Sequence, residues 1–268
     1  MTLRDHVSLE RYEGVDLVGL SYPIAAFLFV LGLWLVLTTV FRLPSFVLPS
    51  PIAVGTTIVD NAGRLAHHTL ITLYESLLGL FIAVVFGVGF ALAISASTIV
   101  RRTFYPGLVV LNALPKVALA PLFLIWFGQG FLPKLALAFL ISFFPITINT
   151  LTGLLDVDPE FIELARIYHA SPVEVYTKVR LPNALSYFFA GLKTAVTLAI
   201  IGAIVAEFTG AQVGIGYLIQ LASYNINTVL VFAALIILGA MSLVLFKLAE
   251  LLERWAMPWR ESEDRLTR

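Results

Sequence analysis

The sequence contains no cysteine and little charge. Of its 268 residues, 13% are charged and 59% are hydrophobic, whereas a typical soluble domain has roughly 25% charged residues. Without cysteine, the chain cannot form disulfides, thiolate metal sites or thiol nucleophiles. So few charged side chains cannot cover the surface of a water-soluble globule of this size. We therefore predict an integral membrane protein, and the mean hydropathy of +0.94 agrees with this.

Sequence signals for several other functions are also absent. The net charge is zero, so we predict no nucleic-acid partner. A phosphate-binding loop needs a Gly-Lys pair, and none occurs. His67 and His68 are adjacent and not a helical turn apart, so no metal site is predicted. The carboxylates do not converge in the apolar runs, and we therefore predict no catalytic residues and no enzyme activity in this chain.

Long apolar runs make up most of the sequence. Each is near the roughly 20 residues that cross a bilayer, and none alternates as a barrel strand does. Acidic residues such as Asp5 and Glu13 precede the first run, and no cleavage site follows it, so we expect a retained helix and not a signal peptide. The sequence predicts an all-α bundle of six membrane-spanning helices, at residues 22–41, 72–97, 104–127, 132–153, 184–208 and 228–250.

Lysine and arginine are distributed unevenly between the predicted loops. If the N-terminus is cytoplasmic, the three residues on the outer side are Arg42, Arg64 and Lys134. The twelve on the inner side are Arg4, Arg11, Arg101, Arg102, Arg166, Lys178, Arg180, Lys247, Arg254, Arg260, Arg265 and Arg268. Short loops rich in Lys and Arg remain in the cytoplasm. This bias predicts that both terminal segments, residues 1–21 and 251–268, are cytoplasmic.

One predicted cytoplasmic loop, residues 156–182, is long and polar. Asp158 and Pro159 are typical of a helix start. The apolar residues that follow share one helical face: Phe161, Leu164, Ala165 and Tyr168. Such a helix either docks into a groove of a soluble partner or lies on lipid headgroups, although it lacks the Lys/Arg-rich face of a lipid binder. We expect a second helical stretch over 173–179.

The same loop resembles the cytoplasmic signature of permease subunits of binding-protein-dependent ABC importers. That signature is Glu-Ala-Ala, three residues, Gly, nine residues, then Ile-x-Leu-Pro. This chain has Glu163-Leu164-Ala165, then His169 at the Gly position, then Val179-Arg180-Leu181-Pro182. Glycine reaches a left-handed turn more readily than His169 does. We expect Leu181-Pro182 to turn the chain back into the membrane.

Further motifs look like the nitrate, sulfonate and taurine branch of that family, which also includes permeases for thiamine-precursor pyrimidines. They are Leu48-Pro49-Ser50-Pro51, Ala120-Pro121-Leu122-Phe123, Trp126-Phe127-Gly128, Phe144-Pro145-Ile146, Ala206-Glu207 and Gly214-Ile215-Gly216. The resemblance implies a permease domain over 22–250 in the inner membrane, working as a homodimer. It also implies two ATP-binding subunits that hold ATP and Mg, with no cofactor in this chain, and an extracytoplasmic substrate-binding protein.

By the same resemblance, residues 163–182 couple the permease to its ATPase. The expected coupling residues are Glu163, Leu164, Ala165, Tyr168, His169, Leu181 and Pro182.

Lys116 is expected close to the membrane midplane, between Pro115 and Pro121, where these prolines predict a kinked or broken helix. A buried cation at that depth costs at least about 2.5–3.5 kcal/mol, so it must face a partner or an aqueous path. It either lines the translocation path with Pro115, or it snorkels or binds a helix C-terminus. Glu207 is either hydrated at the outer interface or lines an outer vestibule. We expect Lys193 to snorkel and Glu75 to be interfacial.

The function that these features favour is import of a small solute by an ATP-driven permease. Lys116 points to an anion such as a sulfonate or nitrate, and the aromatic spans leave a neutral heterocycle open. A membrane-embedded enzyme or a sensor subunit is the alternative from another class.

Overall fold

The computed structural model describes residues 17–258, and these residues form helices without a β-strand. The segments are α1 (Leu17–Thr39), α2 (Pro51–Asp60), α3 (Ala62–Ala96), α4 (Thr98–Ala113), the 3₁₀ turn η1 (Lys116–Leu119), α5 (Ala120–Phe127), α6 (Phe131–Leu155), α7 (Pro159–Ile167), α8 (Pro172–Val175), the π-turn η2 (Tyr176–Arg180), α9 (Leu181–Phe208), α10 (Ile215–Tyr224) and α11 (Thr228–Ala256). Most of each predicted terminal segment lies outside the described residues.

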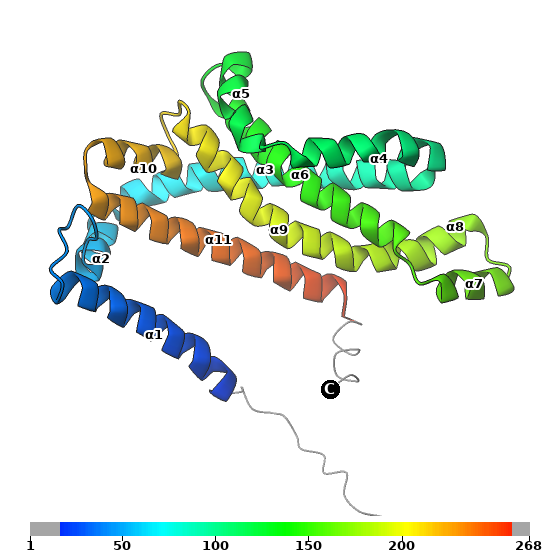
Figure 1. The fold of residues 1–268 in the computed structure, drawn as a ribbon, viewed down its shortest axis with the longest axis horizontal. Coiled ribbons are helices and arrows are strands. Elements are labelled where there is room, and N and C mark those ends of the chain that lie inside the picture. The colour runs from blue at the N-terminus through cyan, green and yellow to red at the C-terminus, as the bar shows by residue number, and fades with distance from the viewer. Residues whose placement is uncertain (1–16, 259–268) are drawn as a thin grey trace, which may run out of the picture.

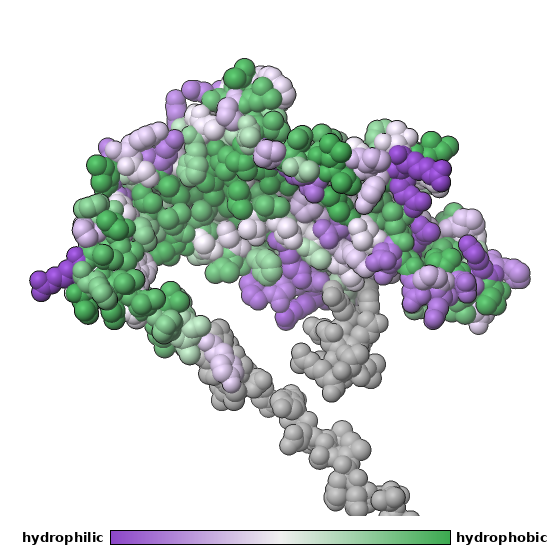
Figure 2. Space-filling model, viewed as in Figure 1, coloured by the Kyte–Doolittle hydropathy of each residue, from purple (hydrophilic) through white to green (hydrophobic). Residues whose placement is uncertain are grey.

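The long helices α3, α6, α9 and α11 form the body of the molecule (Figure 1). The most extensive contacts join α6 to α9 and α3 to α6. The short helices α7 and α8 lie at one end, and α2 and α10 lie at the other (Figure 1). Hydrophobic residues cover most of the visible body, and hydrophilic residues gather around the α7 end (Figure 2). This distribution is that of a membrane-spanning bundle with one polar end.

Small residues let the central helices approach closely. A Cβ added at Gly202 of α9 would lie 2.8 Å from the Cα of Ala138 in α6. No real side chain fits at that separation, so the contact between α6 and α9 depends on the glycine. Small residues serve this purpose in membrane bundles, where helices associate by close packing and not by hydrophobic exclusion from water.

Four helical runs are long and apolar enough to cross a membrane, namely Ala62–Ala96, Phe131–Leu155, Pro172–Phe208 and Thr228–Ala256. The pair Thr98–Ala113 and Lys116–Phe127 is a fifth if it counts as one bent span. The apolar part of α1, Ile24–Thr39, is shorter. The prediction of an all-α polytopic membrane protein is confirmed, whereas the count of six spans stays a prediction.

The helix predicted over 104–127 is broken, as its prolines indicate, and α4 and the η1–α5 pair meet at 84°. Pro115 lies at this break and cannot donate a main-chain hydrogen bond. One predicted boundary is wrong. The turn expected at Leu181-Pro182 is absent, since the helical run is continuous from Pro172 to Phe208. The π-turn η2 ends at Arg180, two residues before Pro182, and the wider turn makes room for a ring that would otherwise meet a carbonyl of the preceding turn.

Candidate functional site

The first candidate region is the surface of α7, between α6 and α9. Asp158 caps this helix, since its carboxylate accepts a hydrogen bond from the Glu160 amide at 3.0 Å. Pro159 occupies its first turn. Both features were predicted from the sequence. The helix ends at Ile167.

The apolar face of α7 is exposed. Phe161 is 60% exposed, Leu164 49% and Tyr168 78%, while Ala165 is half-buried between them. Glu163 lies beside this face and is also exposed. Leaving three large apolar side chains in water is unfavourable, so this face has the character of a surface that another molecule covers.

His169 adopts the left-handed turn that glycine favours. Its φ is +54°, and it follows Tyr168, the C-cap of α7. The His169 amide donates to the Arg166 carbonyl at 3.0 Å, and the Ala170 amide donates to the Ala165 carbonyl at 2.9 Å. These two bonds satisfy carbonyls in the last turn of α7. The turn geometry of the signature is therefore retained although its glycine is replaced.

The loop that carries α7 is tied to the helices on both sides. The Asn183 side-chain amide of α9 donates to the carbonyls of Gly153, at 2.8 Å, and of Asp156, at 3.0 Å. The Tyr187 hydroxyl donates to the Asp156 carboxylate at 2.8 Å. These bonds satisfy the end of α6, where helix carbonyls lack main-chain partners. A displacement of α7 is thereby connected to both α6 and α9.

The second candidate region is a cavity of about 420 Å³ between α4, η1, α6 and α9. Its polar lining consists of Asn112, Lys116, Asn149 and Thr194. Lys116 is the one charged residue that lines it. A cavity of this size suits a small solute.

Lys116 sits at the break that Pro115 makes. Its ammonium donates to the carbonyl of Asn112 at 2.7 Å and to the side-chain oxygen of Asn112 at 3.1 Å. It also lies 4.5 Å from the centre of the Phe144 ring, which is a cation–π contact. Lys116 therefore binds the C-terminal turn of a helix, as one of the two predictions states, and it also lines a cavity.

The third region is a buried polar cluster at the α10 end. Lys134 of α6 forms a 2.6 Å ion pair with Glu75 of α3, and both side chains are almost fully buried. The Lys134 ammonium also donates to the Val213 carbonyl at 3.2 Å. The expectation of an interfacial Glu75 is therefore wrong. Helix α3 begins at residue 62 and not near 72, so Glu75 lies more than three turns inside it and faces α6.

Glu207 belongs to the same cluster and is fully buried. Its carboxylate accepts hydrogen bonds from the Thr72 hydroxyl at 2.6 Å and from the Gly216 amide at 2.5 Å. Neither expectation for Glu207 describes this environment, because the side chain is not hydrated and lies apart from the Lys116 cavity. The reason is that α10 packs back against α3 and α9, which the sequence does not show.

The segment before α10 is held by α3. The Gly214 amide donates to Nδ1 of His68 at 3.1 Å, and the Ile215 amide donates to the Thr72 hydroxyl at 2.8 Å. Sequence reasoning missed His68 and Thr72, and its only signal was the Gly214-Ile215-Gly216 motif. Lys193 differs as well, because it forms a 2.5 Å ion pair with Glu253 of α11 and does not simply snorkel.

Residues 79–258 match the family described as the binding-protein-dependent transport system inner membrane component. This range covers about two thirds of the chain and includes every helix from the middle of α3 to the end of α11. The chain belongs to this permease family. Its members are ABC importer permease subunits, which work with ATP-binding subunits and a substrate-binding protein and are not themselves enzymes. This permease is accordingly a multi-pass protein of the inner membrane.

Individual relatives support the same assignment. The permease is 39% identical over 217 residues to a probable ABC transporter permease protein of Haemophilus influenzae, covering 81% of this chain and 89% of the relative. It is 35% identical over 257 residues to the riboflavin transport system permease protein RibX of Chloroflexus aurantiacus, covering 95% of this chain and 94% of the relative. It is 32% identical over 239 residues to a putative aliphatic sulfonates transport permease protein, SsuC, of Bacillus subtilis, covering 88% of this chain and 86% of the relative.

Solved structures agree on the fold. A structure described as an inward-facing conformation of the MetNI methionine ABC transporter superposes with a TM-score of 0.60 at 18% identity. The match covers 69% of this permease and 92% of the solved chain. At this level of identity the likeness concerns the fold alone.

Proposed function

We propose that this permease imports a small oxyanionic solute, such as a sulfonate or nitrate, through the cavity that Lys116 lines, beside the helix break at Pro115. The solute is delivered by an extracytoplasmic binding protein. The observation that carries the proposal is the Lys116 ammonium, the one charged group lining a 420 Å³ cavity whose other polar groups are neutral. An ammonium among amides and a hydroxyl binds an anion in preference to a cation.

The position of this cavity supports a role in translocation. It lies where α4 is interrupted, and non-helical backbone at membrane depth is tolerated where it is buried in protein or lines a water-filled cavity. The relative SsuC is named for aliphatic sulfonates, which carry the anionic group that this lysine would attract.

A neutral heterocycle is the second candidate solute. The relative RibX is named for riboflavin, a solute with a large heterocyclic ring.

We infer further that two copies of this chain enclose the path, that both termini are cytoplasmic, and that two separate subunits bind ATP and Mg. The coupling residues remain Glu163, Leu164, Ala165, Tyr168, His169, Leu181 and Pro182. Four of them lie on the exposed face of α7 or beside it, and His169 forms the turn that follows. Leu181 and Pro182 begin α9, and a movement of α7 would reach the cavity through this helix.

Uptake by proteoliposomes tests the proposal. The permease is reconstituted with its ATP-binding subunit and binding protein, and uptake of methanesulfonate, nitrate and an aminopyrimidine is compared. We expect ATP-dependent uptake of an anion, and we expect Lys116→Ala to reduce it at least about tenfold, which corresponds to about 1.4 kcal/mol. Lys116→Arg, which keeps the charge, should retain more of the uptake.

Lys247→Ala is the matched control. Lys247 is also on a membrane helix, but its exposed side chain is paired with Glu250 and lies far from the cavity. Unchanged uptake by Lys116→Ala would contradict a role of this lysine in the path. Uptake of the pyrimidine alone, unaffected by Lys116→Ala, would favour the heterocycle.

A further inference from the structure

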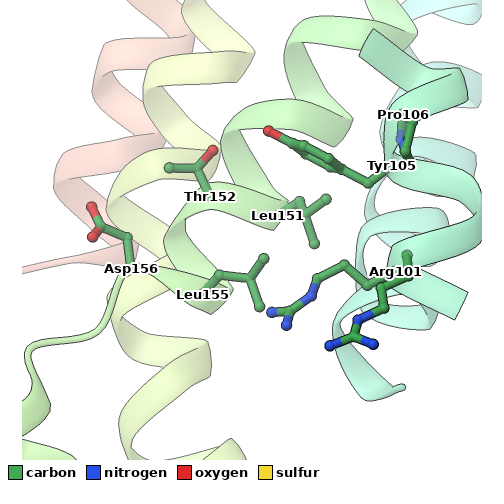
Figure 3. A pocket seen from close by; sticks show the side chains of 8 residues that line it. Arg101, Tyr105, Pro106, Leu151, Thr152, Leu155 and Asp156 are labelled. Carbon is green, nitrogen blue, oxygen red and sulfur yellow. The ribbon is translucent and has the colours of Figure 1, made fainter. Parts of the chain in front are cut away.

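A second and larger cavity, of about 630 Å³, lies between α4 and α6 near the α7 end of the molecule. The residues of α4 that line it include Arg101, Arg102 and Tyr105. On the opposite wall lie Leu151 and Thr152 of α6, with Asp156 just after this helix. Figure 3 shows Arg101 and Asp156 on opposite sides of the space. None of the proposals above uses these arginines.

The two cavities follow one another along the same faces of the same two helices. Tyr105 of the second cavity and Asn112 of the first are two helical turns apart on α4, about 10 Å along its axis. On α6, Thr152 lines the second cavity and Ile148, one turn away, lines the first. A solute that leaves Lys116 along this face therefore meets Tyr105 and the arginines next.

The second cavity has an excess of positive charge. Within residues 17–258, neither Arg101 nor Arg102 has a side-chain hydrogen bond or ion pair. Asp156 is the one acidic residue of the lining, and its carboxylate is already engaged by the Tyr187 hydroxyl at 2.8 Å. Two arginines without partners thus face a single carboxylate that has one.

These groups match the chemistry of an oxyanion. A guanidinium presents parallel N–H donors that bind sulfonate, sulfate or phosphate through two bonds at once. The hydroxyls of Tyr105 and Thr152 add neutral donors from both walls. Apolar side chains such as Leu151 leave room for an organic substituent.

We propose that Arg101 and Arg102, with Tyr105 and Thr152, form an oxyanion-binding site in this second cavity, about two helical turns along α4 from the Lys116 cavity. The occupant is either a free anion or the phosphate of a lipid headgroup, since both present the same tetrahedral group. The site is inferred from its own residues. Only the idea that a solute leaving the Lys116 cavity is released through this site rests on the proposed function.

The absence of cysteine allows a direct test. Leu155 also lines the cavity, and Leu155→Cys places a single thiol there without removing a polar group. The variant is reconstituted in phosphatidylcholine nanodiscs, and the rate of its reaction with a neutral maleimide is measured with sodium sulfate or with sodium chloride at equal ionic strength. We expect sulfate to slow labelling several-fold and the added pair Arg101→Gln and Arg102→Gln to abolish the effect.

Two further arms identify the source of the anion and control for general effects. Labelling of Leu155→Cys is also compared between phosphatidylglycerol and phosphatidylcholine nanodiscs. Slower labelling in phosphatidylglycerol that the same two substitutions abolish supports the site with a lipid phosphate as its occupant. Val173→Cys on the exposed surface of α8 is the control thiol, and its labelling should not respond.

The proposal is overturned if neither sulfate nor phosphatidylglycerol slows labelling of Leu155→Cys. It is equally overturned if the slowing persists in the double glutamine variant, or if Val173→Cys responds to the same extent. Because no transport is measured, binding can succeed where uptake fails, and the two proposals are tested separately.

Discussion

At the scale of single residues, the buried cluster at the α10 end is the part of the chain that we expect to be most sensitive to substitution. Three side chains of α3 and α9, those of His68, Thr72 and Glu207, form the hydrogen bonds that hold the start of α10, and the ion pair of Glu75 and Lys134 closes the cluster. A buried donor left without its acceptor costs about 1–3 kcal/mol. The cluster therefore sets the position of α10 and tolerates little change.

Gly214→Ala tests whether the cluster sets the position of α10. Gly214 has φ +118° and ψ 163°, a conformation that is essentially restricted to glycine, and an added Cβ would lie 2.1 Å from Oε1 of Glu207. The backbone strain and the overpacking each cost about 1–3 kcal/mol. We expect a clear fall in the thermal unfolding midpoint of the purified permease.

Gly63→Ala is the control for that measurement. Gly63 lies in α3 near the same end, and an added Cβ meets nothing within 4 Å. Alanine replaces glycine in a helix there, so this variant should be unchanged or slightly more stable. Equal midpoints for Gly214→Ala and the unsubstituted permease would show that the cluster does not hold α10.

At the scale of elements, α7 combines a strong local definition with an exposed apolar face. Its cap at Asp158, its first-turn proline and its left-handed end at His169 define the helix without help from tertiary contacts. Local signals of this kind are readable in a sequence because they involve residues a few positions apart. They define the helix and its ends, whereas the partner that covers its face must come from elsewhere.

Ala165→Asp tests the coupling surface. A carboxylate in the middle of the apolar face would be buried unpaired against the ATP-binding subunit, at a cost of about 3–5 kcal/mol. We expect the variant to insert and to keep its fold, because no membrane helix is changed. Copurification of the ATP-binding subunit, or ATP hydrolysis stimulated by the binding protein, should be lost.

Ala62→Asp carries the same substitution at the exposed start of α3, at the opposite end of the molecule. It should retain both properties. If Ala165→Asp retained full association and full transport, α7 would not be the coupling element.

At the scale of the whole molecule, the two ends differ in character. The α7 end carries the exposed polar loop (Figures 1 and 2), whereas the α10 end contains a cluster of buried charged residues around Glu207. Lys134 was counted among the three outer positive residues, and it is neutralised there by Glu75. The excess of Lys and Arg toward the α7 end predicts that this end faces the cytoplasm.

Single cysteines test the resulting orientation. Arg102→Cys and Glu174→Cys, near the α7 end, should react with an impermeant maleimide only when the cytoplasmic side is accessible. Asn225→Cys, in the exposed turn after α10, should react in intact cells. Labelling of Glu174→Cys from outside would reverse the orientation and contradict cytoplasmic termini.

The sequence by itself determined the membrane class, the helical architecture and the capped helix of the polar loop before α9. These depend on composition, on apolar runs and on signals within one helix, such as the break that Pro115 makes in the third predicted span. It also identified Lys116 as a residue that needs a partner or a cavity, because its burial follows from its depth in an apolar run.

The tertiary structure alone decided which charged groups meet. Glu75 and Lys134 are 59 positions apart, and Thr72 and Glu207 are 135 apart. Helical periodicity indicates which residues share a face, but it does not say which faces of two helices pack together. For the same reason, only the packing of α4 against α6 placed Arg101 and Arg102 in line with Lys116, along one side of the bundle.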